Sequence, residues 1–146
     1  LPTFQQRYGM PTLAVVPGYR PYWRHLQCSA TDLAAAMTYA LGSLAPADRA
    51  QLVEWLRAAV AVQPWGVWAA GSAAAPGHKP GWAFKPEGRP DHWVVHSVGF
   101  AGPGERYVVA VMYDLPAGRS ATTGAQVVTD VVALTFGRPV VKVRGP

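Results

Sequence analysis

The sequence predicts an α+β fold, in which helices pack on an antiparallel β-sheet. Two helical patterns come early in the chain, at residues 29–42 and from 46 onward, and a third begins near Thr123. Between them lie runs rich in valine and aromatic residues that are joined by polar turns, a pattern typical of neighbouring antiparallel strands. No repeat or linker divides the 146 residues, so we expect 1–146 to be a single domain or part of one.

Residues 1–28 are expected to be irregular, because four prolines interrupt any long helix in this part of the chain. The stretch from Arg7 to Trp23 is predicted to be a long aromatic loop. Loops of this length are usually functional or lie over a partner surface.

The first helix is predicted to begin at Ser29, because the hydroxyl of Ser29 and the carboxylate of Asp32 have the spacing of a capping box. Apolar residues follow at helical spacing, and Gly42 is a natural end. The second helix is expected to start near Pro46, since proline is favoured in a first turn. Its predicted buried face contains Leu52, Trp55, Leu56, Ala59 and Val60.

The middle of the chain is predicted to form the sheet. Residues 63–68 are expected to be a short strand or turn, and 69–77 an exposed loop, because small residues dominate there. Strands are expected near 79–84, 92–101 and 105–114, the last two joined by a Gly-Pro-Gly turn.

The last helix is predicted to end at Gly137. The residues expected to share its apolar face are Val127, Val128, Val131, Val132 and Thr135. The tail beyond Pro139 is expected to add at most an edge strand, because proline cannot donate a ladder hydrogen bond.

Composition argues against several classes of protein. The formal net charge is +5, but the basic residues are scattered, whereas a nucleic-acid-binding domain usually carries a basic stripe. Charged residues make up only 14% of the chain, which excludes a disordered tail. The apolar runs are shorter than the roughly 18 residues that span a bilayer, so no membrane span is expected. The absence of Asn and Ile indicates a GC-rich genome, as in actinobacteria.

We expect no metal site and no cofactor. Cys28 is the only cysteine, so neither an internal disulfide nor a cysteine-based zinc site can form, and an ordinary thiol is predicted. His92 and His96 have a spacing that suits zinc on a helix, but on a strand they lie roughly 13 Å apart. That separation is too large for both histidines to bind one metal ion.

A resemblance to a known family starts at His78-Lys79-Pro80-Gly81-Trp82. This run opens a strand and resembles the third active-site motif of serine β-lactamases and penicillin-binding proteins, Lys-Thr/Ser-Gly. From Ser29 onward, over roughly the last 110–120 residues, the order of elements is similar to the C-terminal part of class A β-lactamase-like serine hydrolases, especially divergent actinobacterial ones. The resemblance implies the C-terminal part of a β-lactamase/transpeptidase-like fold.

The resemblance also implies acyl transfer through a serine ester. Lys79 would be the catalytic cation, which supports the substrate carboxylate and the proton network around the serine. Gly81 would give the substrate access to the strand backbone, and His78 and Trp82 would flank the cleft as substrate-binding residues. The residues alone leave open a solvated lysine at position 79 and a structural histidine at position 78. Pro80 departs from the family pattern, because it lacks the hydroxyl that would bind the carboxylate.

The nucleophile of that chemistry is missing from the chain. No serine is followed three residues later by lysine, and a Ser-Asp-Asn motif is impossible because the chain contains no Asn. Both motifs belong to the N-terminal half of the family fold. We therefore expect this chain to be the C-terminal portion of a longer precursor. Ser97 lies in Val-His-Ser-Val-Gly, which lacks the first glycine of a nucleophile elbow, so it is expected to be a plain strand residue.

Three functional hypotheses follow. The first is part of a β-lactamase-like serine hydrolase that acts on a small-molecule or peptidoglycan-like substrate, with the missing N-terminal portion as its partner. The second is a catalytically inactive module that binds a ligand or a protein, with Tyr8, Tyr19, Tyr22 and Trp23 of the aromatic loop as its contact surface. The third is an unrelated α+β domain. The family resemblance implies an extracytoplasmic or secreted location, although the chain contains no signal-peptide pattern.

Overall fold

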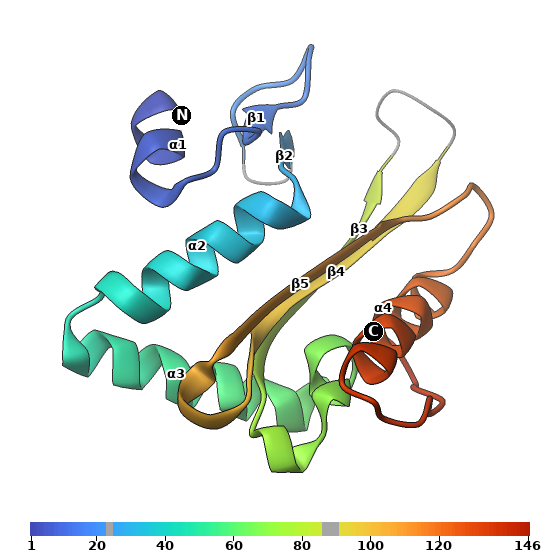
Figure 1. The fold of residues 1–146 in the computed structure, drawn as a ribbon. Coiled ribbons are helices and arrows are strands. Elements are labelled where there is room, and N and C mark those ends of the chain that lie inside the picture. Colours follow the sequence, from blue (N-terminus) through green and yellow to red (C-terminus); the bar gives the residue numbers. More distant parts are fainter. Residues whose placement is uncertain (23–24, 86–90) are drawn as a thin grey trace.

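The computed structural model describes residues 1–22, 25–85 and 91–146, and it confirms the α+β class: four helices and a three-stranded antiparallel sheet with helices packed against it (Figure 1). The helices and strands are α1 (Pro2–Tyr8), β1 (Ala14–Val15), β2 (Leu26–Gln27), α2 (Ala30–Ser43), α3 (Pro46–Val62), β3 (Gly77–Lys85), β4 (His92–Ala101), β5 (Tyr107–Asp114) and α4 (Ala121–Thr135). Short 3-10 helices among the described residues include η2 (Gly66–Ala70), η3 (Ser72–Ala74) and η4 (Pro103–Glu105).

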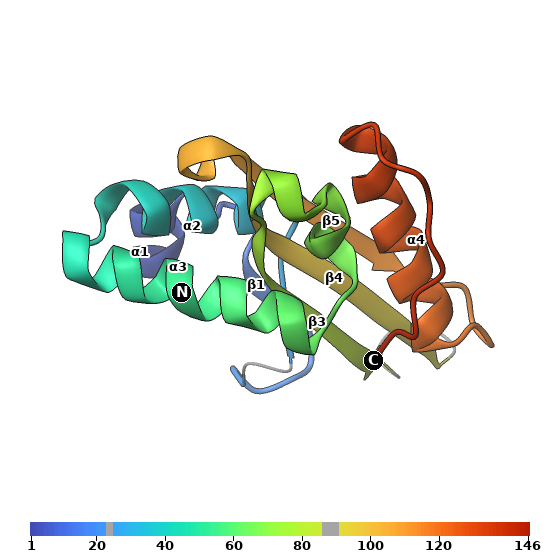
Figure 2. The ribbon, with the colours of Figure 1, turned by 90° about the horizontal axis from the view of Figure 1, so that it is seen from below.

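The sheet has the strand order β3-β4-β5 and separates two groups of helices, as the view from below shows (Figure 2). On one face, which we call the α4 face, Val95 packs with Trp65 of the η2 region and with Ala125 and Val128 of α4. The opposite face, which we call the α2–α3 face, buries Phe100 against Met37, Val53 and Leu56. Neighbouring residues of each strand therefore point into different environments.

α2 begins as the sequence predicted. The Ser29 hydroxyl accepts a hydrogen bond from the Asp32 amide at 3.1 Å, and the Asp32 carboxylate accepts one from the Ser29 amide at 3.2 Å. This reciprocal pair is a capping box. The predicted start of α3 at Pro46 is also confirmed. Its predicted buried face is wrong at Trp55, which is 65% exposed, because the helix rests on the sheet through the narrower stripe of Val53 and Leu56.

The expectation of an irregular segment over residues 1–28 is wrong for residues 2–8, which form α1. Pro2 occupies the first turn, where its missing N–H costs no helical hydrogen bond. Gly9 then ends the helix in the left-handed conformation, at φ 65°. The ring of Tyr8 packs edge-on against Tyr39 of α2, at 4.9 Å between centroids, so part of the predicted aromatic loop is instead a packed helix. Trp23, also predicted to lie in this loop, falls outside the described residues.

The connection before β3 is more buried than the sequence predicted. Ala69 and Ala70, expected in an exposed loop, are buried in η2, because small side chains allow this turn to pack on α4. The backbone amide of Gly66 donates a hydrogen bond to the Thr129 hydroxyl of α4 at 2.9 Å, which anchors the turn.

The C-terminal elements also differ in detail. α4 starts two residues earlier than predicted, at Ala121, with the Ser120 side chain as its N-cap. Val131, placed by sequence on the buried face, is 43% exposed, whereas its neighbour Val132 is fully buried. The tail forms no strand within the described residues, although Val143 packs into the core. In the described ranges we find no helix that is both long and apolar enough to span a membrane.

Candidate functional site

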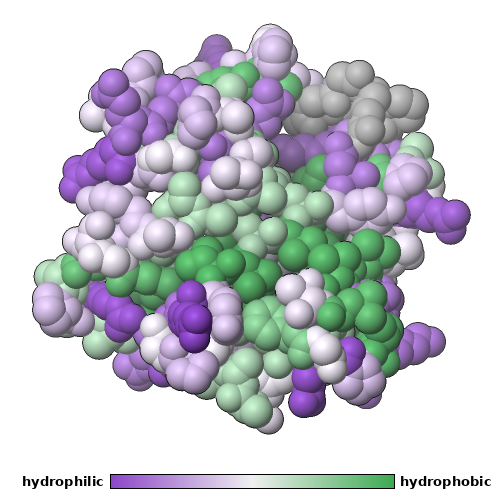
Figure 3. All heavy atoms as spheres, viewed as in Figure 1, coloured by the Kyte–Doolittle hydropathy of each residue, from purple (hydrophilic) through white to green (hydrophobic). Residues whose placement is uncertain are grey.

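A groove of about 1160 Å³ opens on the α2–α3 face of the sheet. One wall is formed by β3, β4 and β5, and the facing wall by β1, β2 and the start of α2. We call it the sheet groove. Polar residues on its sheet wall include Lys79, Lys85 and His96, while Met10, Leu13 and Leu33 make much of the facing wall apolar. Apolar residues also gather elsewhere, in a band across α2, β5 and α4 (Figure 3).

Strand alternation decides which of the predicted site residues reach this groove. Lys79 and Gly81 occupy alternate positions of β3 and both line the groove. Lys79 is exposed, and its ammonium group donates a hydrogen bond to the carbonyl of Pro80. The side chain therefore keeps further donors for a ligand, since an ammonium group has three.

His78 lies on the opposite side of β3 and is fully buried. Its Nδ1 atom lies 3.1 Å from the Ser97 hydroxyl. Burial lowers the pKa of His78 to about 4, an effect that the backbone of Gln63 and Ala59 offsets only in part. The structure thus does not bring this predicted substrate-binding residue into the sheet groove.

The Ser97 hydroxyl of β4 contacts both β3 and the η2 turn. Besides its contact with His78, it accepts a hydrogen bond from the Val67 amide at 3.1 Å. The hydroxyl is buried and lies on the α4 face, away from the sheet groove. This placement agrees with the sequence expectation of a strand residue.

Trp82 borders the groove, but its ring belongs to another cluster. The indole packs edge-on against Trp65 at 6.2 Å between ring centroids and remains 40% exposed. Of the four predicted site residues, the structure thus brings Lys79, Gly81 and Trp82 to the groove.

The sequence did not single out His96 as a member of this site. Gly81 and His96 are direct partners in the antiparallel ladder of β3 and β4, and the imidazole reaches across to cover the glycine. Burial lowers the pKa of His96, and the positive charges of Lys79 and Lys85 add to the effect. Its Nδ1 atom is buried without a hydrogen-bond partner in the described ranges. Only the strand register, which the sequence does not specify, could have revealed the pairing with Gly81.

The facing wall brings a thiol and a hydroxyl to the groove, but neither is activated. Burial raises the pKa of Cys28, and the nearby Asp32 carboxylate raises it further, so the thiolate form is disfavoured. The Ser29 hydroxyl is engaged as the N-cap of α2. Asp32 is inaccessible and bound by the Thr12 hydroxyl and the Ser29 amide, which occupy its carboxylate.

The described side chains that are chemically able to bind a metal ion do not cluster. His92 Nε2 lies 3.2 Å from Asp114 Oδ1 at one end of the groove. Within residues 1–22, 25–85 and 91–146, no three His, Cys, Asp or Glu side chains lie close enough together to hold a metal ion.

No known protein-family model, curated protein or solved structure matches the chain.

Proposed function

We propose that this chain forms the lysine-bearing wall of a serine acyl-transfer site of the β-lactamase-like type. The nucleophilic serine would come from polypeptide outside these 146 residues. The observation that carries the proposal is the position of Lys79: an exposed ammonium group on a strand that lines a large, mostly apolar groove. In acyl transfer of this type, positive charge stabilises the substrate carboxylate and the developing oxyanion, and a partly apolar surrounding strengthens that interaction.

The size of the groove fits a site that is completed by a second segment. Its volume of about 1160 Å³ exceeds the roughly 300–1,000 Å³ of most small-molecule pockets. A substrate and a segment carrying the nucleophile would fit together in that space. The substrate would be a β-lactam or a peptidoglycan-like acyl compound, and the site would operate outside the cytoplasm.

The test is acylation of the natural full-length protein by a fluorescent penicillin. We expect a covalent adduct that survives denaturation and is strongly reduced by Lys79→Ala. Lys142→Ala removes an exposed lysine from the C-terminal tail and should leave labelling unchanged. A protein that forms no adduct, or one that is labelled equally with and without Lys79, would contradict the proposal.

Two features favour the second candidate function, a binding module without turnover. Pro80 is buried and offers neither a hydroxyl nor an N–H to a ligand. His96 covers the backbone at Gly81, so a substrate reaches the strand there only if the imidazole moves aside. This candidate predicts saturable, fully reversible binding of labelled penicillin or of a peptidoglycan fragment, with no covalent adduct.

The aromatic surface is the other contact region that this candidate offers. Tyr19 and Tyr22 are 43% and 52% exposed, which suits a protein partner. Replacing Tyr22 and Trp23 by Ala should weaken partner capture. Unchanged capture would exclude this surface as the contact.

A further inference from the structure

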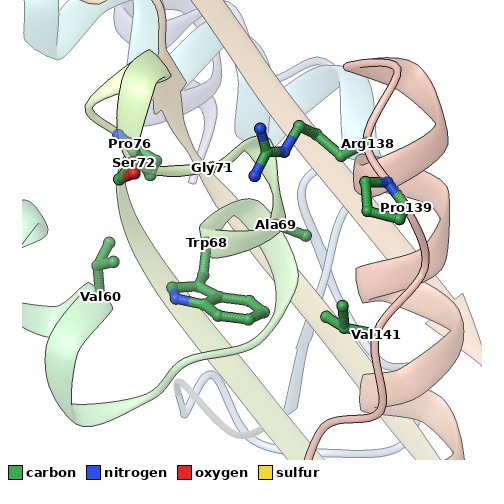
Figure 4. Close-up of a pocket in the computed structure, with 9 residues that line it drawn as sticks. All are labelled: Val60, Trp68, Ala69, Gly71, Ser72, Pro76, Arg138, Pro139 and Val141. Atoms are coloured by element: carbon green, nitrogen blue, oxygen red, sulfur yellow. The ribbon is translucent and has the colours of Figure 1, made fainter.

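A second, smaller pocket lies away from the sheet groove, between the end of α3, η2 and the C-terminal tail (Figure 4). Its volume of about 310 Å³ is at the lower end of the range for small-molecule sites. Most of the lining is apolar, from Val60, Trp68 and Val141 among others. Arg138 and Ser72 add polar groups, so the pocket combines an apolar body with a single basic residue.

The end of α4 holds the backbone of Arg138, whose side chain is exposed. Its backbone amide donates a hydrogen bond to the Ala133 carbonyl at the end of α4, at 2.8 Å. Its guanidinium group then extends toward Gly71, as Figure 4 shows. A Cβ atom at residue 71 would lie 2.9 Å from Nε and 3.0 Å from Cζ of Arg138, so the guanidinium packs closely against the backbone of Gly71. Gly71 also has a φ of +87°, which other residues rarely adopt.

The guanidinium of Arg138 is unpaired within the part of the chain that the structure describes. Among those residues, no hydrogen-bond acceptor and no carboxylate pairs with the Arg138 side chain. A guanidinium offers five N–H donors in a planar fork that matches a carboxylate. These donors therefore remain available to a ligand in the pocket.

We propose that this pocket binds a small amphiphilic monocarboxylate. The carboxylate pairs with the Arg138 guanidinium, with the Ser72 hydroxyl as a second donor, and the hydrocarbon part lies against Trp68 and Val141. One basic residue in the lining matches one negative charge, whereas a phosphate dianion would need further cations. The site is independent of Lys79 and of acyl transfer in the sheet groove.

The test is a titration of the chain with sodium octanoate, followed by NMR at the indole N–H signal of Trp68. We expect a saturable shift, with affinity reduced about tenfold by Arg138→Gln because a charge-assisted hydrogen bond is lost. Arg138→Lys should retain part of the affinity. Octanol, which has the hydrocarbon chain without the charge, should bind more weakly than octanoate.

Two matched controls separate this site from general charge effects and from the sheet groove. Arg144→Gln removes an exposed arginine from the same tail, and Lys79→Ala removes the lysine of the groove; neither should change the titration. The proposal would be overturned by the absence of a saturable shift at Trp68, or by equal octanoate affinity with and without Arg138. Equal binding of octanol and octanoate would also overturn it.

Discussion

The imidazole of His96 covers the backbone of Gly81, with Nε2 only 2.3 Å from the position that a Cβ atom at residue 81 would occupy. The two residues are direct partners across β3 and β4. The absence of a side chain at residue 81 therefore leaves the space that the imidazole of His96 occupies. This relationship makes the pair a point where stability and access to the groove are coupled.

Gly81→Ala should lower the free energy of unfolding by about 1–2 kcal/mol, because the new methyl group forces the half-buried imidazole out of its position. His96→Ala removes the imidazole. In that background, Gly81→Ala should therefore lower the free energy of unfolding by less than it does in the original protein. Urea unfolding of the four proteins of this cycle measures the coupling. If the effects of the two substitutions were additive, the contact between residues 81 and 96 would not account for the loss in free energy of unfolding.

Gly42→Ala is the matched control for this substitution. Gly42 lies near the end of α2, and no atom lies within 4 Å of the position that a Cβ atom would occupy there. Alanine is the better helix former, so we expect this variant to be more stable by about 0.5 kcal/mol. A loss of stability at Gly42 as large as that at Gly81 would mean that the methyl clash is not the cause.

The stability of the fold should fall in mild acid because of His78. Burial lowers the pKa of His78 from 6.5 to about 4, so between these values the unfolded chain binds a proton that the folded chain does not. The free energy of unfolding is therefore unaffected by His78 above pH 6.5. It falls by about 3 kcal/mol in total as the pH falls toward 4. Urea unfolding at a series of pH values measures this slope.

His78→Gln should flatten that pH dependence, because glutamine does not titrate. His96 contributes in the same direction, since its pKa is also lowered by burial, so a smaller slope should remain. Combining His78→Gln with His96→Gln should remove most of the remainder. An unchanged slope after both substitutions would assign the acid sensitivity to other groups.

Asp32 should stabilise the wall of the groove that faces the sheet. Although burial opposes its ionisation, hydrogen bonds from Thr12 and Ser29 lower the pKa of this carboxyl, so its contribution is present at neutral pH and lost in acid. Asp32→Asn should cost about 1–3 kcal/mol at pH 7, because the amide cannot replace both acceptor oxygens. Hydrogen exchange at the Ser29 amide should become faster.

The control for Asp32 is another helix cap that is remote from the groove. Ser120 caps α4 by accepting a hydrogen bond from the Thr123 amide at 3.2 Å. Ser120→Ala should cost about 1 kcal/mol without speeding exchange at Ser29. If both variants affected Ser29 equally, the effect would be global rather than local.

Glu105 should stabilise the contact between the β4–β5 turn and α3. Its carboxylate lies 2.6 Å from Arg49 and 2.7 Å from Arg57, and its side chain is only 9% exposed. Its backbone is in the left-handed region, at φ 57°. Glu105→Ala should lower the free energy of unfolding by about 1–2 kcal/mol, because both ion pairs are lost. Glu105→Gly should lower it by about 1 kcal/mol less than Glu105→Ala does, since glycine relieves the backbone strain. Thermal unfolding compares the two, and equal losses would exclude a strained backbone.

Much of the fold could be predicted from local sequence. The capping box at Ser29, the proline at the start of α3 and the valine-rich strands each depend on residues close in the chain, and the structure confirms them. The prolines of residues 1–28 do not by themselves predict α1, because proline interrupts a helix interior but is compatible with the first turn, where Pro2 lies. Of the predicted site residues, Lys79, Gly81 and Trp82 lie at the groove, whereas His78 does not.

Local sequence was enough to predict which residues alternate along β3 and where α2 and α3 begin, because both depend on interactions over a few residues. That Lys79 faces the groove while His78 is buried follows from tertiary packing, because period-2 alternation does not say which face the helices cover. Local sequence likewise does not predict that His96 contacts Gly81 or that Arg138 packs against Gly71. Both join segments that are distant in the chain, and their geometry follows from strand register and helix packing.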